Sequence, residues 1–181
     1  VTCYLQDVTR QKQAEQTLAD SLTRTTDLYE ISRRIGLVHT AGDVLQALLG
    51  SRWLADVSAE ALLIFDRPWE ETPPSRIEVD AVWRADGGPP PAQRLWEVLS
   101  PSTLGMLFQR NAPMQIEDVT TNQRIPAPIR DELEQAAMRS LLFFPLIAGG
   151  LWYGVLMLGS KNPHGWTADA TRHIQGLIDQ A

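Results

Sequence analysis

The sequence predicts an α+β fold, an antiparallel sheet of five or six strands with helices at both ends of the chain. Three observations predict it. Residues 140–160 have the pattern of a β-hairpin, helical patterns with one apolar side stand near both ends, and the strand patterns between them are joined by turns or short helices. We therefore expect the terminal helices to flank the sheet, with helix and loop insertions over its other face.

The predicted hairpin consists of two apolar runs, Leu141–Ile147 and Leu151–Leu158, separated by Ala148-Gly149-Gly150. Glycine allows the positive φ angles that tight hairpin turns need. Neither run alternates with polar residues, so both faces of these strands should be covered. Pro145 has no N–H group to offer a ladder, and we expect a bulge or an unpaired amide there.

The length, composition and net charge of the chain argue against several classes of protein. Its 181 residues are 44% hydrophobic, which suits one globular domain with an appendage, and its net charge of −6 gives no basic surface for nucleic acid or an anionic membrane. Cys3 is the one cysteine, so no disulfide forms within the chain. No apolar run reaches the roughly 20 residues of a membrane span, and the chain opens without Met or a signal-peptide pattern. We expect a cytoplasmic piece of a longer protein, without membrane insertion.

The first part of the chain carries an apolar stripe at helical spacing. Residues 1–9 are β-like, and residues 10–27 are polar with a helical composition. Two interpretations stay open: one solvated helix packed on its own domain, or the seam of a parallel two-helix homodimer. We favour the homodimer, because residues 10–27 hold too few apolar residues to stand alone as a helix. The stripe consists of Leu18, Leu22, Leu28, Ile31, Ile35 and Val38.

The pattern Thr40-Ala41-Gly42-Asp43 resembles a capping box and predicts that a helix begins there. Residues 60–66 then have the composition of a strand, and residues 68–75 that of a polar loop. Residues 77–83 alternate between apolar and polar side chains, which predicts a half-exposed strand. The helix should bury Val44, Leu45, Leu48 and Leu49, and the strand should present Ile77, Val79, Ala81 and Trp83 on one face.

The remaining elements alternate between helix and strand. Ser100-Pro101 begins a short helix, because serine caps a helix and proline suits its first position. Residues 114–119 form a brief strand, and Thr167 caps the final helix. Between them, a helix should turn Ile129, Leu133, Ala136 and Ala137 inward, and the final helix should bury Ala170, Ile174, Leu177 and Ile178.

Taken in order, residues 28–181 resemble a GAF domain. The segment Arg139-Ser140 with Pro145-Leu146 is similar to the family's Arg-Ser…Pro-Leu strand, and the helix at 28–37, the strands at 60–66 and 114–119, Gly154-Val155-Leu156 and Trp166-Thr167 complete the series. Separately, Asp7-Val8-Thr9 before a charged helix resembles the exit of a PAS domain. The resemblance divides the chain into a PAS remnant (1–9), a linker or coiled-coil helix (10–27) and a GAF domain (28–181). It implies a bacterial multidomain sensor whose output domain, a two-component histidine kinase or a nucleotide cyclase, follows in the same chain.

The resemblance implies a non-catalytic sensory domain that binds a small molecule between the sheet and the segments joining its second, third and fourth strands. The alternative is a ligand-free module for dimerisation and relay, in which the same side chains close a solid core. Asp118 has two uses open to it, a ligand contact or a cap on the turn after its strand, and we favour the cap. The implied ligand-binding residues are Trp83, Leu104, Phe108, Ile116, Asp118, Ile125 and Ser140.

The resemblance also bears on cofactors. Family members with a covalent bilin use a pocket cysteine, and Cys3 lies outside the domain. The family's cyclic-nucleotide signature begins Asn-Lys, which is reversed here at Lys161-Asn162, so we expect no cyclic nucleotide. The three histidines, His39, His164 and His173, have no metal-ligand spacing, and we expect them on the surface, which argues against haem. No acid–base dyad, phosphate-binding loop or nucleophile elbow is evident, which argues against an enzyme.

Overall fold

The computed structural model describes residues 8, 10–19, 21–22, 41–49, 51–88, 110 and 112–179. Its centre is a five-stranded antiparallel sheet in the order β2-β1-β5-β4-β3, which confirms the predicted α+β fold. The strands are β1 (Ala59–Trp69), β2 (Ile77–Arg84), β3 (Met114–Ile116), β4 (Ser140–Ala148) and β5 (Leu151–Ser160). The helices are α2 (Ala41–Leu49), the 3₁₀ helix η1 (Arg52–Leu54), α5 (Ala127–Gln135) and α6 (Ala168–Ile178).

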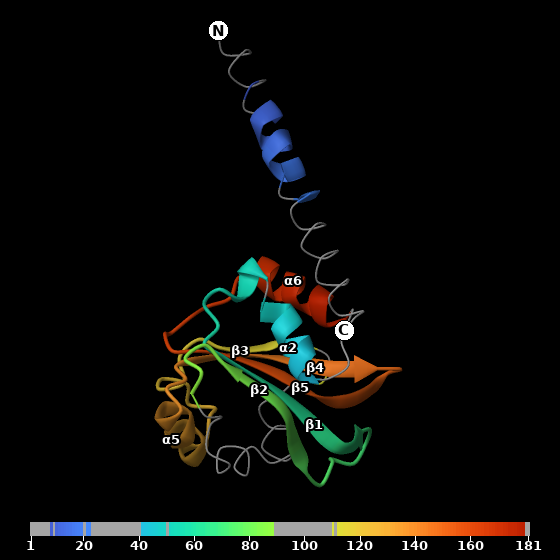
Figure 1. The fold of residues 1–181 in the computed structure, drawn as a ribbon, viewed down its shortest axis with the longest axis vertical. Coiled ribbons are helices and arrows are strands. Elements are labelled where there is room, and N and C mark those ends of the chain that lie inside the picture. The colour runs from blue at the N-terminus through green and yellow to red at the C-terminus, as the bar shows by residue number, and fades with distance from the viewer. Residues whose placement is uncertain are drawn as a thin grey trace.

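Helices α2 and α6 lie together over one face of the sheet, and α5 lies away from them, toward the other face (Figure 1). Two apolar clusters fill the layers above and below the strands. The helix-side cluster consists of Leu45, Leu48, Leu54, Val57, Leu142, Phe144, Leu156, Leu158, Trp166, Ile174 and Leu177. The α5-side cluster consists of Ala59, Ala61, Leu63, Phe65, Ile116, Val119, Ile125, Ile129, Leu133, Met138, Leu141, Phe143, Trp152, Val155 and Met157. Both faces of the hairpin strands are therefore covered, as predicted.

The β4–β5 hairpin forms as predicted, around a two-residue turn in which Gly149 (φ 57°) and Gly150 (φ 79°) both have positive φ. Pro145 does not cause the expected bulge: it pairs in register with Val155, and the register shifts only between Leu146 and Ile147. The reason lies at the other edge of β4. In the described part of the chain β3 pairs only with residues 141–143, so the outer edge of β4 beside Pro145 has no strand that needs its N–H.

The half-exposed strand predicted at residues 77–83 forms as β2, but its four apolar residues do not share one face, because β2 contains a bulge. Leu62 pairs with Ala81 and Leu63 pairs with Val79, which leaves Asp80 as an extra residue. One extra residue inverts which face each later side chain occupies. Residues 77 and 79 consequently pack against the α5-side cluster, whereas Ala81 and Trp83 pack against the helix-side cluster.

Strand β1 is longer than predicted. It continues through Pro68 to Trp69, where the sequence predicted a loop from residue 68 onward. The predicted burial of Leu45 and Leu48 on α2 is confirmed, and α6 begins as predicted, with the Thr167 hydroxyl accepting from the N–H of Ala170. Strand β3 ends at Ile116, three residues before its predicted end. The helices predicted at 28–37 and from Ser100 lie outside the described residues. None of the helices in the described ranges is long and apolar enough to cross a membrane.

Helix α5 ends with an alanine in the left-handed region. Ala137, predicted to face inward, is exposed at φ 57°, while the N–H groups of Ala137 and Met138 donate to the carbonyls of Glu134 and Leu133. This bonding pattern is the Schellman motif, which usually places glycine at that position. The positive φ of Ala137 is therefore a local strain within an otherwise favourable helix end.

Replacing Ala137 with glycine should stabilise the domain by about 1 kcal/mol, because glycine adopts the left-handed conformation without a Cβ clash. Urea unfolding followed by circular dichroism would measure the change. Ala136→Gly is the matched control: Ala136 has φ −77°, so glycine there should only lower stability. Equal effects of the two variants would contradict this explanation.

Candidate functional site

Two of the seven predicted ligand-binding residues come together in the structure. Ile116 at the end of β3 and Ile125 in the following loop both belong to the α5-side cluster and are 3% and 2% exposed. Leu104 and Phe108 lie outside the described residues. Of the predicted site, the described residues therefore bring together only this apolar part, on the face of the sheet turned toward α5.

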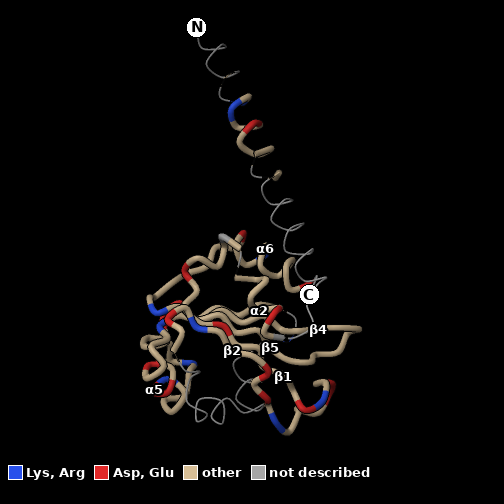
Figure 2. The backbone as a smooth tube through the Cα atoms, in the orientation of Figure 1, with Lys and Arg blue, Asp and Glu red and all other residues tan. Residues whose placement is uncertain are grey.

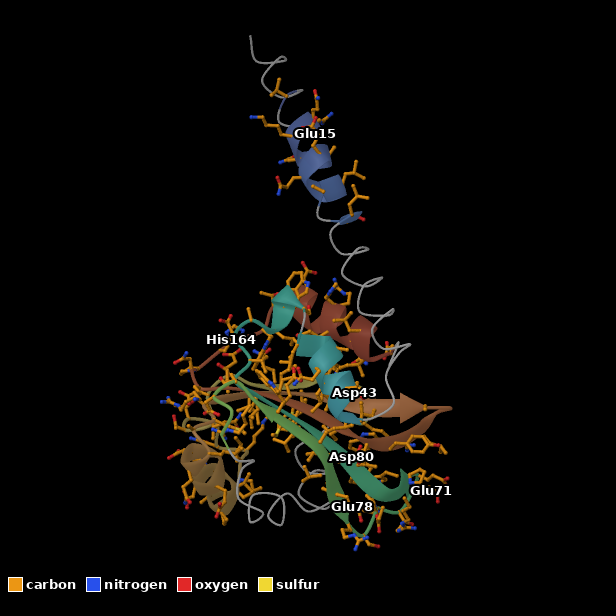
Figure 3. The ribbon with its side chains drawn as sticks, in the orientation of Figure 1. Glu15, Asp43, Glu71, Glu78, Asp80 and His164 are labelled. Atoms are coloured by element: carbon orange, nitrogen blue, oxygen red, sulfur yellow. The ribbon has the colours of Figure 1, made fainter. Side chains whose placement is uncertain are left out.

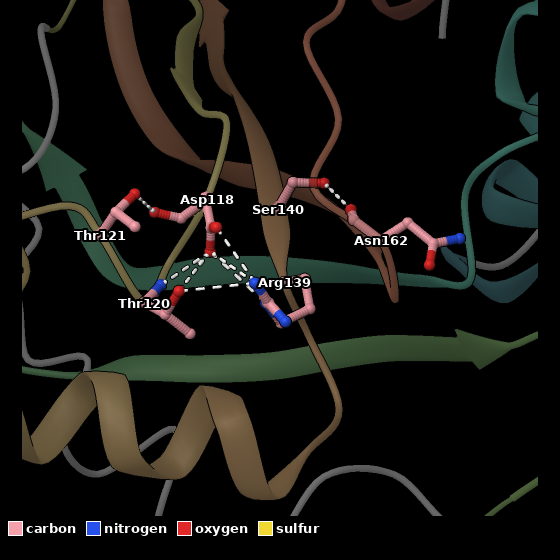
Figure 4. Close-up of polar contacts among 6 residues, drawn as sticks. All are labelled: Asp118, Thr120, Thr121, Arg139, Ser140 and Asn162. Carbon is pink, nitrogen blue, oxygen red and sulfur yellow. Dashed lines mark hydrogen bonds and ion pairs between the residues drawn. The ribbon is translucent and has the colours of Figure 1, made fainter.

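Trp83 and Ser140 lie on the opposite face. The bulge at Asp80 turns Trp83 toward the helix-side cluster. Ser140 is fully buried, shares the face of Leu142, and donates its hydroxyl proton to the carbonyl of Asn162 at 2.9 Å (Figure 4). The sheet itself separates both side chains from Ile116 and Ile125, so neither can touch a ligand bound on the α5 side.

Asp118 is held by its own loop and by Arg139, the residue directly before β4 (Figure 4). Its carboxylate accepts from the N–H of Thr120 at 3.0 Å and from the Thr120 hydroxyl at 2.7 Å, and it forms an ion pair with Arg139 at 3.1 Å. The hydrogen bonds from Arg139 and then Thr120 lower the pKa of Asp118 below its usual 3.8. These contacts favour the alternative in which Asp118 caps the turn after its strand.

Asp118→Asn should lower the melting temperature at pH 7, because the amide cannot hold Arg139 and Thr120 equally well. A carboxylate with a lowered pKa stabilises the fold above pH 3.8 and loses that effect as pH falls through its folded value. The difference from the unmodified protein should therefore shrink toward pH 3, as measured by circular dichroism. Glu117→Gln, at the exposed neighbouring position, is the control and should change little. A difference that stays constant with pH would refute the assignment.

Three aromatic rings form a platform on the α5-side face, and the sequence reasoning missed it. Trp69 stacks on Trp152 with centroids 4.8 Å apart and planes 13° apart, and Phe65 meets both rings edge-on. Trp152 is fixed further by its indole N–H, which donates to the carbonyl of Gly154 at 2.6 Å. Only Trp69 of the three is partly exposed. The sequence pattern does not predict the platform, because proline usually ends a strand and Pro68 stands directly before Trp69.

An apolar groove of about 380 Å³ opens on the other face of the sheet, at the ends of α2 and α6. Leu62 of β1 and Leu156 of β5 line the groove from the sheet, Leu48 lines it from α2, and Tyr153 and Asp179 also belong to its wall. The full lining consists of Val44, Leu48, Leu62, Pro145, Leu146, Ile147, Ala148, Tyr153, Leu156, Ile178 and Asp179. The groove and the aromatic platform are therefore separate features on opposite faces.

Comparison with known proteins identifies the fold family. The sequence model described as the GAF domain matches residues 34–181. The chain belongs to the GAF domain family. No curated protein was matched.

Solved structures agree with this assignment at the level of the fold. The phycocyanobilin-bound GAF domain of a cyanobacterial phytochrome has 16% identity and a TM-score of 0.62, covering 87% of this chain and 90% of that one. A domain of a protein assigned as a two-component sensor histidine kinase from Sinorhizobium meliloti 1021 has 16% identity and a TM-score of 0.55, covering 78% and 87%. The photosensory core of a Stigmatella aurantiaca phytochrome has 14% identity and a TM-score of 0.60, covering 87% and 35%. At these identities the likeness shows a shared fold.

One histidine of this GAF domain is placed differently from the sequence expectation. His173 on α6 is buried, with its ring 5.2 Å from that of Trp53. His164 is half-buried in the loop before α6 and meets Trp166 edge-on, whereas His39 lies outside the described residues. Among the residues that the structure describes, no three His, Cys, Asp or Glu side chains gather as metal ligands.

Acidic and basic residues are mixed along the loops and the edge strand β2 in the described part of the GAF domain (Figure 2). Asp86 joins two of these segments: it accepts from Arg84 at the end of β2 and from Lys161 after β5, both at 2.9 Å. The hydrogen bonds from Arg84 and then Lys161 hold the pKa of Asp86 well below its usual value. These ion pairs tie the end of β2 to the segment that follows β5.

Proposed function

We propose that this GAF domain is a non-catalytic sensory module that binds a small molecule on the α5-side face of its sheet and relays binding to α2 and α6 on the other face. The observation that carries the proposal is the pair of clusters on opposite faces of the same strands. Alternate residues of β1, β4 and β5 point to the two faces, so a change in strand position on one side moves the contacts on the other. Such a relay requires two arrangements with unequal ligand affinity.

The chemistry of the α5-side face suits an apolar, planar ligand. The cluster that contains Ile116 and Ile125 is apolar, and Trp69 packs against the same cluster nearer the β4–β5 turn, where it offers a partly exposed aromatic ring. Ligand sites are commonly apolar with a few polar groups. Relatives with this fold include one solved with phycocyanobilin, but the one cysteine here, Cys3, precedes the matched region, so a thioether bond within residues 34–181 is not available.

The ligand proposal is tested by a thermal-shift screen of metabolites, including free tetrapyrroles and flavins. A stabilising compound should lose affinity in Trp69→Leu, because the platform on the α5 side is then incomplete. Trp83→Leu is the matched control, since it removes a tryptophan from the opposite face. Equal loss in both variants would contradict this placement of the site.

A ligand-free relay is the second candidate function. It is favoured by the dense α5-side cluster, in which Ile129 and Leu133 of α5 are only 2% and 1% exposed. In this case the cluster is a solid core, and the domain transmits the state of a preceding module through its helices. A screen that finds no stabilising compound, together with a confirmed homodimer, would support this candidate over the first.

Both candidates require a homodimer. Leu18 and Leu22, on a helical segment that lies apart from the sheet, are 62% and 61% exposed (Figure 1). Two exposed leucines four residues apart form the start of an apolar seam. The other stripe residues, Leu28, Ile31, Ile35 and Val38, lie outside the described residues. A parallel pairing through this stripe would place the two domains side by side, with the outputs after α6 adjacent.

Light scattering of the Leu18→Lys/Leu22→Lys double variant tests the homodimer. The unmodified chain should have the mass of a dimer, and the double variant should have that of a monomer. Gln13→Lys/Gln16→Lys adds the same charge to the other side of the helix and should remain dimeric. A monomeric unmodified chain would rule out this part of the proposal.

The wider context is also a proposal. Residues 1–9 would be the end of a PAS domain, residues 10–27 a coiled-coil linker, and a histidine kinase or cyclase would follow in the same chain. The likeness to a domain of a protein assigned as a sensor histidine kinase supports a signalling role. Sequencing the parent gene beyond residue 181 would decide which output module follows.

A further inference from the structure

Glu60, the second residue of the interior strand β1, is a completely buried glutamate. It is 0% exposed, and neither of its carboxyl oxygens has a hydrogen-bond partner in the described part of the chain. The pairing register of β1 sets it between Trp83 on β2 and Leu158 on β5. Burying an ionised carboxylate without a partner is very costly, so this position holds a neutral acid.

Glu60 lies beneath the helices that the proposed relay uses. Residues directly opposite in a sheet share a face, and both Trp83 and Leu158 pack in the helix-side cluster. That cluster also contains Leu48 of α2 and Leu177 of α6. The carboxyl group is therefore in the layer between the sheet and α2 with α6, and its charge would be felt by both helices.

The apolar groove reaches the next position of β1 on the same face as Glu60. Leu62, the next residue of β1 on the same face, lines the apolar groove, as does Leu156 of β5 opposite it. Residues two apart on a strand are separated by about 7 Å. A small opening of α2 would extend the groove toward Glu60 and hydrate an ionised carboxylate.

The other charged groups around this layer lie at its margin. On β2, Arg84 is on the far face and paired with Asp86, while Glu78 and Asp80 are exposed, as is Asp43 on α2 (Figure 3). On α6, Asp169, Arg172 and Asp179 are exposed, and His173 is buried against Trp53. The side chain of Arg52 on η1 lies outside the described residues. His173 is thus the second group whose titration must be separated from that of Glu60.

We propose that Glu60 is a proton-operated latch: while its carboxyl group is neutral, α2 and α6 seat closely on the sheet, and its ionisation draws water into that layer and loosens both helices. This inference rests on the proposed function for its meaning as a signal, because the same two helices would carry the response to a ligand. Burial raises the pKa of Glu60 from 4.5 to about 8, so a change in pH near neutrality changes its charge. Ionisation of Glu60 releases one proton per chain to the solvent.

Nuclear magnetic resonance on the full chain, with ¹³C-labelled glutamate and labelled Ile and Leu methyl groups, tests the latch between pH 5 and pH 9.5. The Glu60 carboxyl signal, assigned by its loss in Glu60→Gln, should titrate with a midpoint near 8. The methyl signals of Leu48 and Leu177 should shift with the same midpoint, and those of Ile129 and Leu133 on the α5 side should not. In Glu60→Gln the helix methyl signals should stay constant with pH.

Two controls sharpen the result. Glu132→Gln removes another buried glutamate, on α5, and should leave the transition intact. His173→Gln should also leave it intact. A Glu60 midpoint near 4.5, helix methyl signals that ignore the Glu60 titration, or a transition lost in His173→Gln would each overturn the latch. Because the measurement needs no ligand and no partner, it is independent of the screens that test the proposed function. If Glu60→Gln fails to fold, Glu60→Leu supplies the assignment of the Glu60 signal in the unmodified chain.

Discussion

Gly154→Ala should destabilise the domain by about 3 kcal/mol or more, one of the largest effects of a single methyl group in this fold. Gly154 lies on β5 and pairs with Ile64 on one side and Leu146 on the other. A Cβ atom at this position would overlap the carbonyl oxygen of Leu63. That oxygen belongs to the backbone of β1, which is held by strands on both sides and cannot retreat.

Gly159→Ala, on the same strand, is the matched control. Its Cβ would meet the sulfur of Met138 at 3.3 Å, the flexible part of a side chain that can move aside. We expect a loss below about 1 kcal/mol there. Urea unfolding of both variants would measure the difference. Similar losses at the two glycines would show that strand propensity, and not the close approach to Leu63, explains them.

The hairpin could be predicted because its local signals agree with one another. Gly149 and Gly150 supply the positive φ of the turn, and the flanking apolar runs cover both faces. The cap at Thr167 and the buried side of α6 were predictable for the same reason, since spacing and capping chemistry act within a few residues. These signals are sufficient to identify the fold class.

The bulges could not be predicted, and they decide which residues face the proposed ligand site. Asp80 in β2 and Tyr153 in β5 are extra residues opposite a regular partner strand. Nothing in an alternating pattern marks such an insertion, because it depends on how two distant strands pair. The bulge at Asp80 places Trp83 on the helix side, away from the face on which we propose that a ligand binds.

The candidate site was therefore predicted only in its apolar part. Ile116 ends a short strand whose register follows from the hairpin, and Ile125 lies in the loop after it; both belong to the α5-side cluster. Asp118 was correctly considered as a cap, since Asp commonly bonds the backbone two residues on. Trp69 was missed because proline usually ends a strand, and Pro68 does not.

Glu60 should make the domain less stable as pH rises from 5 to 9, the reverse of the effect expected for Asp118. The Glu60 carboxyl group has a pKa of about 8 in the folded domain, and we use the ordinary value of 4.5 for the unfolded chain. Between pH 4.5 and pH 8 the folded state therefore holds more protons than the unfolded state. Stability falls with pH wherever the folded state binds more protons. One pKa unit corresponds to about 1.4 kcal/mol, so the decrease in the free energy of unfolding approaches about 5 kcal/mol once pH exceeds 8.

Glu60→Leu should remove this dependence and raise stability at every pH in the range. A leucine of similar volume carries no polar group into the helix-side cluster, and replacing an unpartnered buried acid by an apolar residue is favourable. The gain over the unmodified protein should be smallest near pH 5 and largest near pH 9. Urea unfolding at half-unit pH intervals would measure it.

Glu78→Leu is the control for the change from Glu to Leu on a strand. Glu78 lies two residues before the bulge of β2 and is exposed, so its replacement should shift stability by a similar small amount at every pH. A Glu60→Leu variant whose gain does not grow with pH would mean that the Glu60 carboxylate ionises without penalty. The layer beneath α2 and α6 would then already admit water, and neither the buried acid nor the latch built on it would hold.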